Sequence, residues 1–142
     1  MNLTNLELYA HLSALTLAAI SIVAADNLGM RWFFGKTRVI NRAQARILHY
    51  STGTALVLLL ISGATMFWPL RDYLLHDPLF ILKMCFVAAL IVNSIVIEKL
   101  MGIAATTPFA ELPQTQKVQF ILSGAMSGLC WAGAALCGYF LF

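Results

Sequence analysis

Two side chains able to bind a metal or a cofactor lie near the start of two long apolar segments. His11 is early in the first segment and Lys83 is early in the third. With a rise of about 1.5 Å per residue, each lies roughly 8 to 9 Å below the start of its helix. An imidazole is a common ligand for haem iron, and an ammonium in a low-dielectric site either becomes a ligand or pairs with an anion such as a propionate. The pair therefore suits a porphyrin.

Each residue also has a simpler interpretation. His11 can be an interfacial histidine that bonds to a neighbouring helix, and Lys83 can extend its stem to the headgroups. Tyr9 and His76 lie at or near the same membrane surface, so both are further candidates for cofactor binding. His76 is the alternative to Lys83 as the group opposite His11.

His49, near the start of the second segment, is a second candidate metal ligand. Its depth differs from that of His11 by more than about 10 Å, so the two cannot easily bind one metal ion. A hydrogen bond to the carboxylate of Asp26 or Glu98 is the simpler interpretation. Two haems with two histidines each would need four histidines, and the chain has 3.

Soft ligands fall in the same half of the membrane as His11. They are Met66, Met84, Cys85 and Cys137. Thioethers and thiols suit Cu(I), and they serve equally well as packing residues in an apolar helix. Copper handling therefore remains an alternative to haem binding.

Four apolar segments must position these residues, at approximately 5–28, 45–70, 78–101 and 114–142. Each is near or above the roughly 20 residues that cross a bilayer as a helix. Hydrophobic residues make up 61% of the 142 residues and charged residues 11%, far from the roughly 45–50% and 25% of soluble proteins. We expect an all-α, polytopic membrane protein, a single four-helix up-and-down bundle over residues 1–142.

Local signals refine this expectation. Asn41 with Gln44 has the spacing of a capping box, and Asp77 precedes a proline, so helices should start near residues 42 and 78. Small residues at helical spacing predict close helix packing. They are Ala10, Ala14, Ala18, Ser21 and Ala25 in the first helix, and Gly124 and Gly128 in the fourth. Aromatic residues near the segment ends, Trp32, Phe33, Phe34, Trp68, Tyr73 and Tyr139, are typical of an interfacial belt.

Basic residues indicate how the bundle is oriented. Five of the 9 lie in or next to the first connector: Arg31, Lys36, Arg38, Arg42 and Arg46. Because cytoplasmic connectors collect Lys and Arg, this connector should be cytoplasmic and both termini should lie on the outer, periplasmic side of a bacterial inner membrane. Membrane topology thus explains the net charge of +3 without a nucleic-acid partner.

The sequence resembles a superfamily of four-helix membrane proteins that includes HemJ-like protoporphyrinogen oxidases and, more loosely, CopD-like copper-resistance proteins. The matching stretches are Leu8-Tyr9-Ala10-His11, the basic connector ending at Arg46, and Pro78-Leu79-Phe80-Ile81-Leu82-Lys83. The resemblance implies a haem b near the outer half of the membrane, with His11 as an axial ligand and Lys83 assisting ligation or contacting the porphyrin.

The leading hypothesis is a small membrane protein that binds haem or porphyrin and acts in redox chemistry, by oxidising a porphyrinogen or by exchanging electrons with quinone. An oxidoreductase is one form of this hypothesis. A copper-handling protein and a non-catalytic helical subunit are the alternatives. A chain this small often completes its sites at a subunit interface, so we also expect a homo-oligomer or a larger membrane complex.

Overall fold

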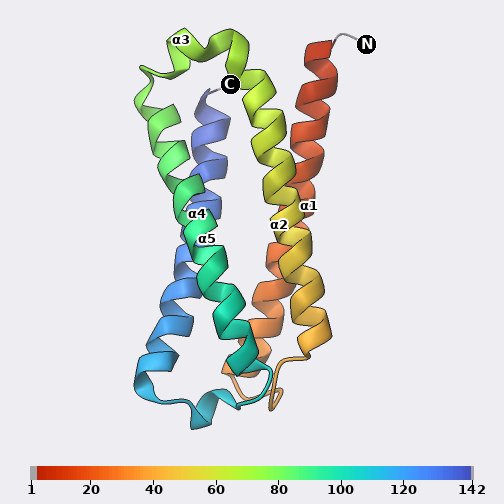
Figure 1. Ribbon diagram of the computed structural model, residues 1–142, viewed down its shortest axis with the longest axis vertical. Coiled ribbons are helices and arrows are strands. Elements are labelled where there is room, and N and C mark those ends of the chain that lie inside the picture. Colours follow the sequence, from red (N-terminus) through yellow and green to blue (C-terminus); the bar gives the residue numbers. More distant parts are fainter. Residues whose placement is uncertain (1–2, 142) are drawn as a thin grey trace.

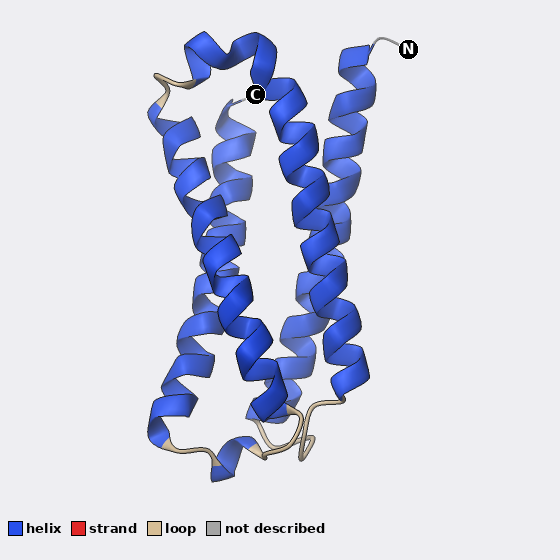
Figure 2. Ribbon diagram, viewed as in Figure 1, coloured by secondary structure: helices blue, strands red, loops and turns tan. Residues whose placement is uncertain are grey.

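The computed structural model describes residues 3–141, with side chains from residue 6 onwards, and this part of the chain is helical without strands (Figures 1 and 2). Four long helices are joined by short connectors that contain two 3₁₀ turns and one short helix. The elements are α1 (Leu3–Phe33), α2 (Arg42–Phe67), η1 (Trp68–Leu70), α3 (Arg71–Leu74), α4 (Pro78–Ala104), η2 (Phe109–Glu111) and α5 (Gln114–Leu141).

Each of the four long helices is long and apolar enough to cross a membrane. The candidate spans are 28, 33, 27 and 28 residues in length. Large apolar side chains cover the outside of the bundle, with Val23 69% and Leu129 71% exposed. Such a surface is typical of a protein whose solvent is lipid. The all-helical, membrane-spanning class predicted from composition is therefore supported by the fold.

Side-chain caps set the starts of α2 and α4. The Asn41 carboxamide oxygen accepts hydrogen bonds from the backbone N–H groups of Ala43 and Gln44, at 3.0 and 3.3 Å. The Asp77 carboxylate accepts from the backbone N–H of Leu79 at 2.8 Å, and Pro78 occupies the first turn of α4. These contacts satisfy N–H groups that have no partner within their own helix. The two predicted helix starts are confirmed.

The bundle consists of two hairpins, α1 with α2 and α4 with α5, which lie side by side along their length (Figure 1). A hydrogen bond of 2.7 Å between the hydroxyls of Ser21 and Ser51 joins α1 to α2. Of the packing stripe predicted on α1, the middle three residues, Ala14, Ala18 and Ser21, are buried, whereas Ala25 is half-buried and Ala10 is exposed. Contacts between the two hairpins are much sparser than contacts within them.

The stripe predicted on α5 is wrong. A Cβ added at Gly124 or Gly128 would meet nothing within 4 Å, so neither glycine brings a neighbouring helix close. Gly133 does this instead, because a Cβ there would lie 2.5 Å from Cε2 of Phe86 on α4. A small residue does bring α5 close to α4, as predicted, but that residue is Gly133 and not Gly124 or Gly128.

The hairpins meet near the connectors that follow α1 and α4, at what we call the basic end. The Trp32 indole N–H donates to the Thr107 carbonyl at 3.2 Å, and its ring lies edge-on to Phe109 and Phe120 with centroids 5.2 and 4.8 Å away. The Ile40 N–H donates to the Ala104 carbonyl at 2.9 Å. Trp32 is only 3% exposed, so its expected place in an interfacial belt is wrong. We call this group the Trp32 cluster.

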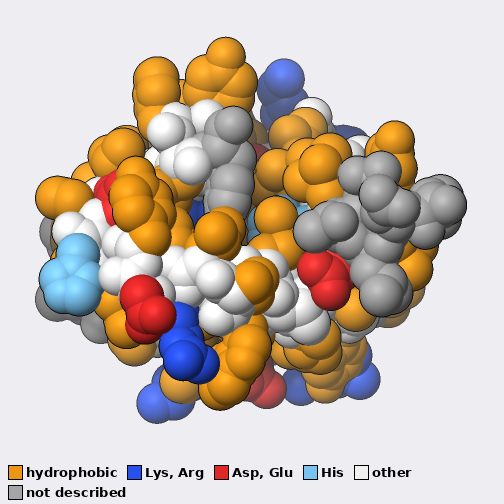
Figure 3. All heavy atoms as spheres, turned by 90° about the horizontal axis from the view of Figure 1, so that it is seen from above, with side chains coloured by type: hydrophobic (Ala, Val, Ile, Leu, Met, Phe, Trp, Pro, Cys, Tyr) orange, Lys and Arg blue, Asp and Glu red, His pale blue; other side chains and the backbone are white. Residues whose placement is uncertain are grey.

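At the opposite end, which we call the terminal end, α1 begins, α5 ends and η1 and α3 connect α2 to α4 (Figure 1). The rings of Phe67 and Phe80 stack there, with centroids 5.2 Å apart and planes inclined by 11°. The surface seen from this end is mostly hydrophobic, with a few charged and histidine side chains (Figure 3). The hairpins are thus joined near both ends of the bundle.

Replacement of Gly133 by Ala should destabilise the α4–α5 hairpin, because the added methyl group collides with the ring of Phe86. Overpacking of this kind costs about 1–3 kcal/mol. Gly128→Ala is the matched control on the same helix, where the methyl group enters open space. Denaturant-induced unfolding in detergent micelles measures both, and equal stability of the two variants would contradict the close α4–α5 contact.

Candidate functional site

His11 projects from α1 to α2 near the terminal end. Its Nδ1 lies 2.8 Å from the Ser62 hydroxyl, and that hydroxyl donates to the Leu58 carbonyl at 2.8 Å. Because the hydroxyl hydrogen is used for Leu58, the hydroxyl accepts from His11, and the proton of the neutral ring belongs on Nδ1. The lone pair is then on Nε2, for which no hydrogen bond is found among the side chains of residues 6–141. His11 is therefore oriented by α2 with one nitrogen available to a ligand.

Lys83 reaches the same layer of the bundle from α4. Its side chain is half-buried, and a methyl group at Gly138 of α5 would lie 3.1 Å from its Nζ. His11 and Lys83 lie at similar distances from the starts of α1 and α4, which both begin at the terminal end. In the part of the chain whose side chains are described, the one ion pair joins Arg71 to Asp72, so Lys83 has no carboxylate partner there.

Two glycines let these functional groups pack closely against the neighbouring helices. A methyl group at Gly63 of α2 would lie 3.8 Å from Cε1 of His11, and Gly138 lies under the Lys83 ammonium. Cys137, next to Gly138, is buried beside Lys83. All four long helices thus contribute to one layer, which we call the His11–Lys83 layer.

The other two residues expected near this layer are placed differently. Tyr9 is 61% exposed on the outside of α1. His76 is exposed in the connector after α3, where its Nδ1 lies 3.0 Å from the Asp72 carbonyl oxygen. Neither forms a hydrogen bond to His11 or Lys83 in the described part of the chain.

A second feature, a cavity of about 310 Å³, lies between the hairpins toward the basic end. We call it the central cavity. Its polar lining includes His49, Asp26 and Ser127, whereas most of the remaining wall is apolar. No hydrogen bond joins His49 to Asp26 in the described structure, although both face the same space. About 20 Å of helix separates His49 from Ser62, the partner of His11.

Three glycines explain why the cavity stays open. Gly29 of α1, Gly53 of α2 and Gly124 of α5 all line it, and a Cβ at any of them would meet nothing within 4 Å. Trp131 is a half-buried part of the cavity wall. The sequence suggested that His49 lies near Asp26 but did not reveal the cavity, because a glycine facing a void and a glycine facing a helix look alike in sequence.

The soft ligands are dispersed. Met84 and Cys85 are exposed on α4, whereas Cys137 is buried. Among residues 3–141 no group of three His, Cys, Asp or Glu side chains is arranged to hold a metal ion. Haem needs only one or two axial protein ligands, so its ligation does not depend on such a cluster.

Comparison of the chain with models of known protein families, with curated protein sequences and with solved structures found no match. The geometry of the His11–Lys83 layer and of the central cavity is therefore the basis for any functional assignment.

One wall of the cavity is held by a reciprocal pair of hydrogen bonds between α4 and α5. The Asn93 amide donates to the Ser123 carbonyl at 3.0 Å, and the Ser123 hydroxyl donates to the Asn93 carboxamide oxygen at 2.8 Å. Asn93→Ala removes both bonds and Ser123→Ala removes only one. We expect losses of unfolding free energy of about 1–2 kcal/mol for Asn93→Ala and about half of that for Ser123→Ala. Unfolding in detergent micelles measures this order, and a larger loss for Ser123→Ala would contradict the arrangement.

Proposed function

We propose that this protein is an integral membrane protein that binds haem b or a related porphyrin in the His11–Lys83 layer and takes part in electron transfer. The observation that carries the proposal is the meeting, in one layer, of an imidazole with a free Nε2 and an ammonium without a carboxylate partner among the described side chains. In a bilayer, charged groups of this kind are costly and mark sites of function.

The donor set fits a porphyrin. His11 would hold a haem iron through Nε2, while Ser62 fixes the ring through Nδ1, as hydrogen-bond partners commonly orient metal-binding histidines. Lys83 offers a positive charge to a propionate, or its amine as a second ligand. Gly63 and Gly138 let the His11 ring and the Lys83 stem pack directly against the backbones of α2 and α5. A bound haem would supply one-electron redox chemistry.

In this proposal the residues of the layer orient the His11 imidazole and partly bury Lys83. The Ser62–Leu58 hydrogen bond keeps the serine hydroxyl in its accepting role toward His11, which holds the imidazole in one tautomer. Both His11 and Lys83 are half-buried, and a low-dielectric surrounding strengthens the attraction between Lys83 and an anionic group. Porphyrinogen oxidation is the reaction that the resemblance to HemJ-like oxidases suggests for such a site.

We place the electron partner, a lipid-soluble quinone, in the central cavity. Its walls are mostly apolar and include the aromatic ring of Trp131, which suits a quinone ring. The His49 imidazole and the Ser127 hydroxyl are hydrogen-bond donors for quinone carbonyl oxygens.

The positive charge of the basic end supports a cytoplasmic location for that end, with both termini on the periplasmic side of a bacterial inner membrane.

His11→Ala should abolish haem binding, because it removes the axial nitrogen. Ser62→Ala should weaken haem affinity about tenfold, since the ring then loses the partner that orients it. The readout is haem titration of the purified variants, followed by the Soret band and a pyridine haemochrome assay.

His76→Ala is the matched control, because this exposed histidine bonds only to its own connector. Its haem affinity should equal that of the unmodified protein. Loss of haem in His76→Ala together with retention in His11→Ala would overturn the assignment of the axial ligand.

Gly124→Leu should block quinone binding, since the leucine side chain extends into the central cavity without a clash at Cβ. We expect the Kd for a short-chain ubiquinone analogue to rise at least about tenfold, as steric exclusion predicts for a filled site. Quenching of tryptophan fluorescence measures the binding, because Trp131 lines the cavity.

Gly128→Leu, one helical turn away on α5 and outside the cavity lining, is the control and should bind quinone normally. Equal binding by both leucine variants would exclude the central cavity as the quinone site while leaving the haem proposal intact.

A further inference from the structure

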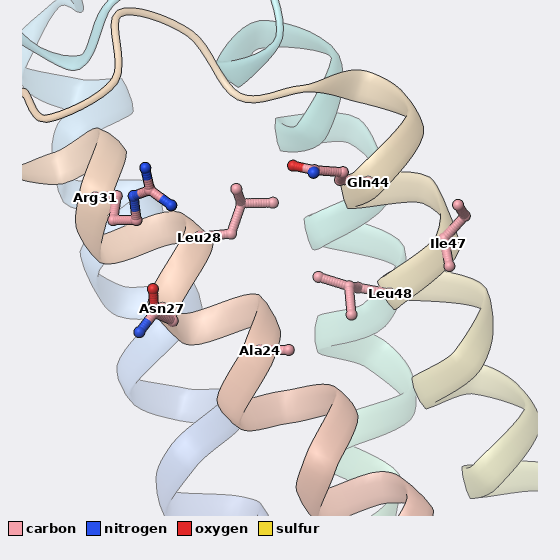
Figure 4. Close-up of a pocket in the computed structure, with 7 residues that line it drawn as sticks. All are labelled: Ala24, Asn27, Leu28, Arg31, Gln44, Ile47 and Leu48. Carbon is pink, nitrogen blue, oxygen red and sulfur yellow. The ribbon is translucent and has the colours of Figure 1, made fainter.

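A groove lies between α1 and α2 at the basic end, on the wall of the first hairpin (Figure 4). It shares Leu28 and Leu48 with the central cavity. It has a volume of about 340 Å³. Its polar side chains are Arg31 and Asn27 from α1 and Gln44 from α2. Arg31 and Gln44 lie on opposite sides of the groove, near the connector (Figure 4). We call it the Arg31 groove.

The groove continues away from the connector along apolar side chains. Leu28 of α1 and Leu48 of α2 point toward one another across it, and Ala24 lies further from the connector (Figure 4). Small Ala24 keeps this part of the groove wide. One end of the groove is thus cationic and able to form hydrogen bonds, and the rest is an apolar channel. This arrangement matches the polar headgroup and the apolar acyl chains of a phospholipid.

The position of the groove in the membrane agrees with this match to a phospholipid. The first span, Leu6–Phe33, has 28 residues and is therefore about 42 Å long as a helix, against about 30 Å for the hydrocarbon core. Arg31, two residues before the end of this span, is then at headgroup level. The apolar part of the groove is at the level of the acyl chains.

The positive charge around the groove favours an anionic headgroup. Residues 31–46 contain five basic and no acidic residues. In the described structure the Arg31 guanidinium has no carboxylate partner, since the one ion pair is Arg71–Asp72. Asp26, the nearest acidic residue along α1, lines the central cavity and not this groove. A choline or ethanolamine ammonium therefore has no counterion here, whereas a net negative phosphodiester has several.

We propose that the Arg31 groove is a specific site for one anionic phospholipid of the surrounding bilayer. The lipid phosphate lies between Arg31 and Gln44, and one acyl chain follows the channel between Leu28 and Leu48. Basic pockets between transmembrane helices on the cytoplasmic side are recognised sites for anionic headgroups. The proposal does not rest on haem or quinone binding, because Arg31, Asn27 and Gln44, which would hold the headgroup, line the groove and not the central cavity.

The test compares Arg31→Gln with Arg38→Gln in nanodiscs of phosphatidylcholine that contain phosphatidylglycerol. Both variants lose one positive charge from the same basic region, but only Arg31 lines the groove. Native mass spectrometry of protein released from the discs counts retained phosphatidylglycerol. We expect Arg31→Gln to weaken its retention about fivefold, the effect of one basic contact to an anionic lipid, and Arg38→Gln to have a clearly smaller effect.

A second variant tests the channel without any change of charge. Ala24→Leu should reduce retention by narrowing the groove, whereas Ala19→Leu, on the same helix and outside the groove, should leave it unchanged. Equal losses for Arg31→Gln and Arg38→Gln would show only diffuse attraction to the basic end and would overturn the site. Retention of phosphatidylcholine equal to that of phosphatidylglycerol would also overturn the specific site. Displacement of phosphatidylglycerol by inorganic phosphate would overturn it as well.

Discussion

The sparse contact between the two hairpins determines most of what is distinctive in this bundle. Within each hairpin, small residues and interhelical hydrogen bonds hold the helices closely, as lipid-embedded helices require. Between the hairpins, the Trp32 cluster at the basic end and the Phe67–Phe80 stack at the terminal end make the contacts. These two attachments fix the spacing of the hairpins at both ends and leave the central cavity between them.

This spacing also explains where the polar side chains can be. A bilayer offers no water to an unpaired polar group, so interior polar atoms must bond within the bundle or to a ligand. Asn93 and Ser123 satisfy each other across α4 and α5. His11 satisfies one nitrogen through Ser62, and Lys83 has no described carboxylate partner. His11 and Lys83 thus keep groups that the described side chains do not pair, which is why we assign the ligand-binding roles to them.

Features that depend on local sequence could be predicted. Four helices follow from hydropathy, and the starts of α2 and α4 follow from the Asn41 and Asp77 caps. Features that depend on contacts between distant residues could not. Trp32 was expected at an interface because nothing near it in sequence reveals the Thr107 carbonyl, 75 positions away. The central cavity was missed for the same reason, since its glycines are separated by tens of residues.

The candidate site lies between these cases. Depth along each helix was enough to place His11 and Lys83 in one layer, because α1 and α4 both begin at the terminal end. The hydrogen bond that sets the tautomer of His11 needed the structure, as did the glycines against which both residues pack. Tyr9 and His76 share that depth but face away from the bundle interior. Depth alone does not reveal on which side of α1 Tyr9 lies, or which path the connector with His76 takes.

The most direct test of haem binding in the His11–Lys83 layer is a reduced-minus-oxidised visible spectrum of the protein purified in mild detergent, with a pyridine haemochrome assay on the same sample. Our account predicts a Soret band and about one haem per chain, either as isolated or after addition of haem, as expected for a single axial histidine site. A protein that stays colourless after haem addition would contradict it, and would favour a metal-handling protein or a non-catalytic helical subunit.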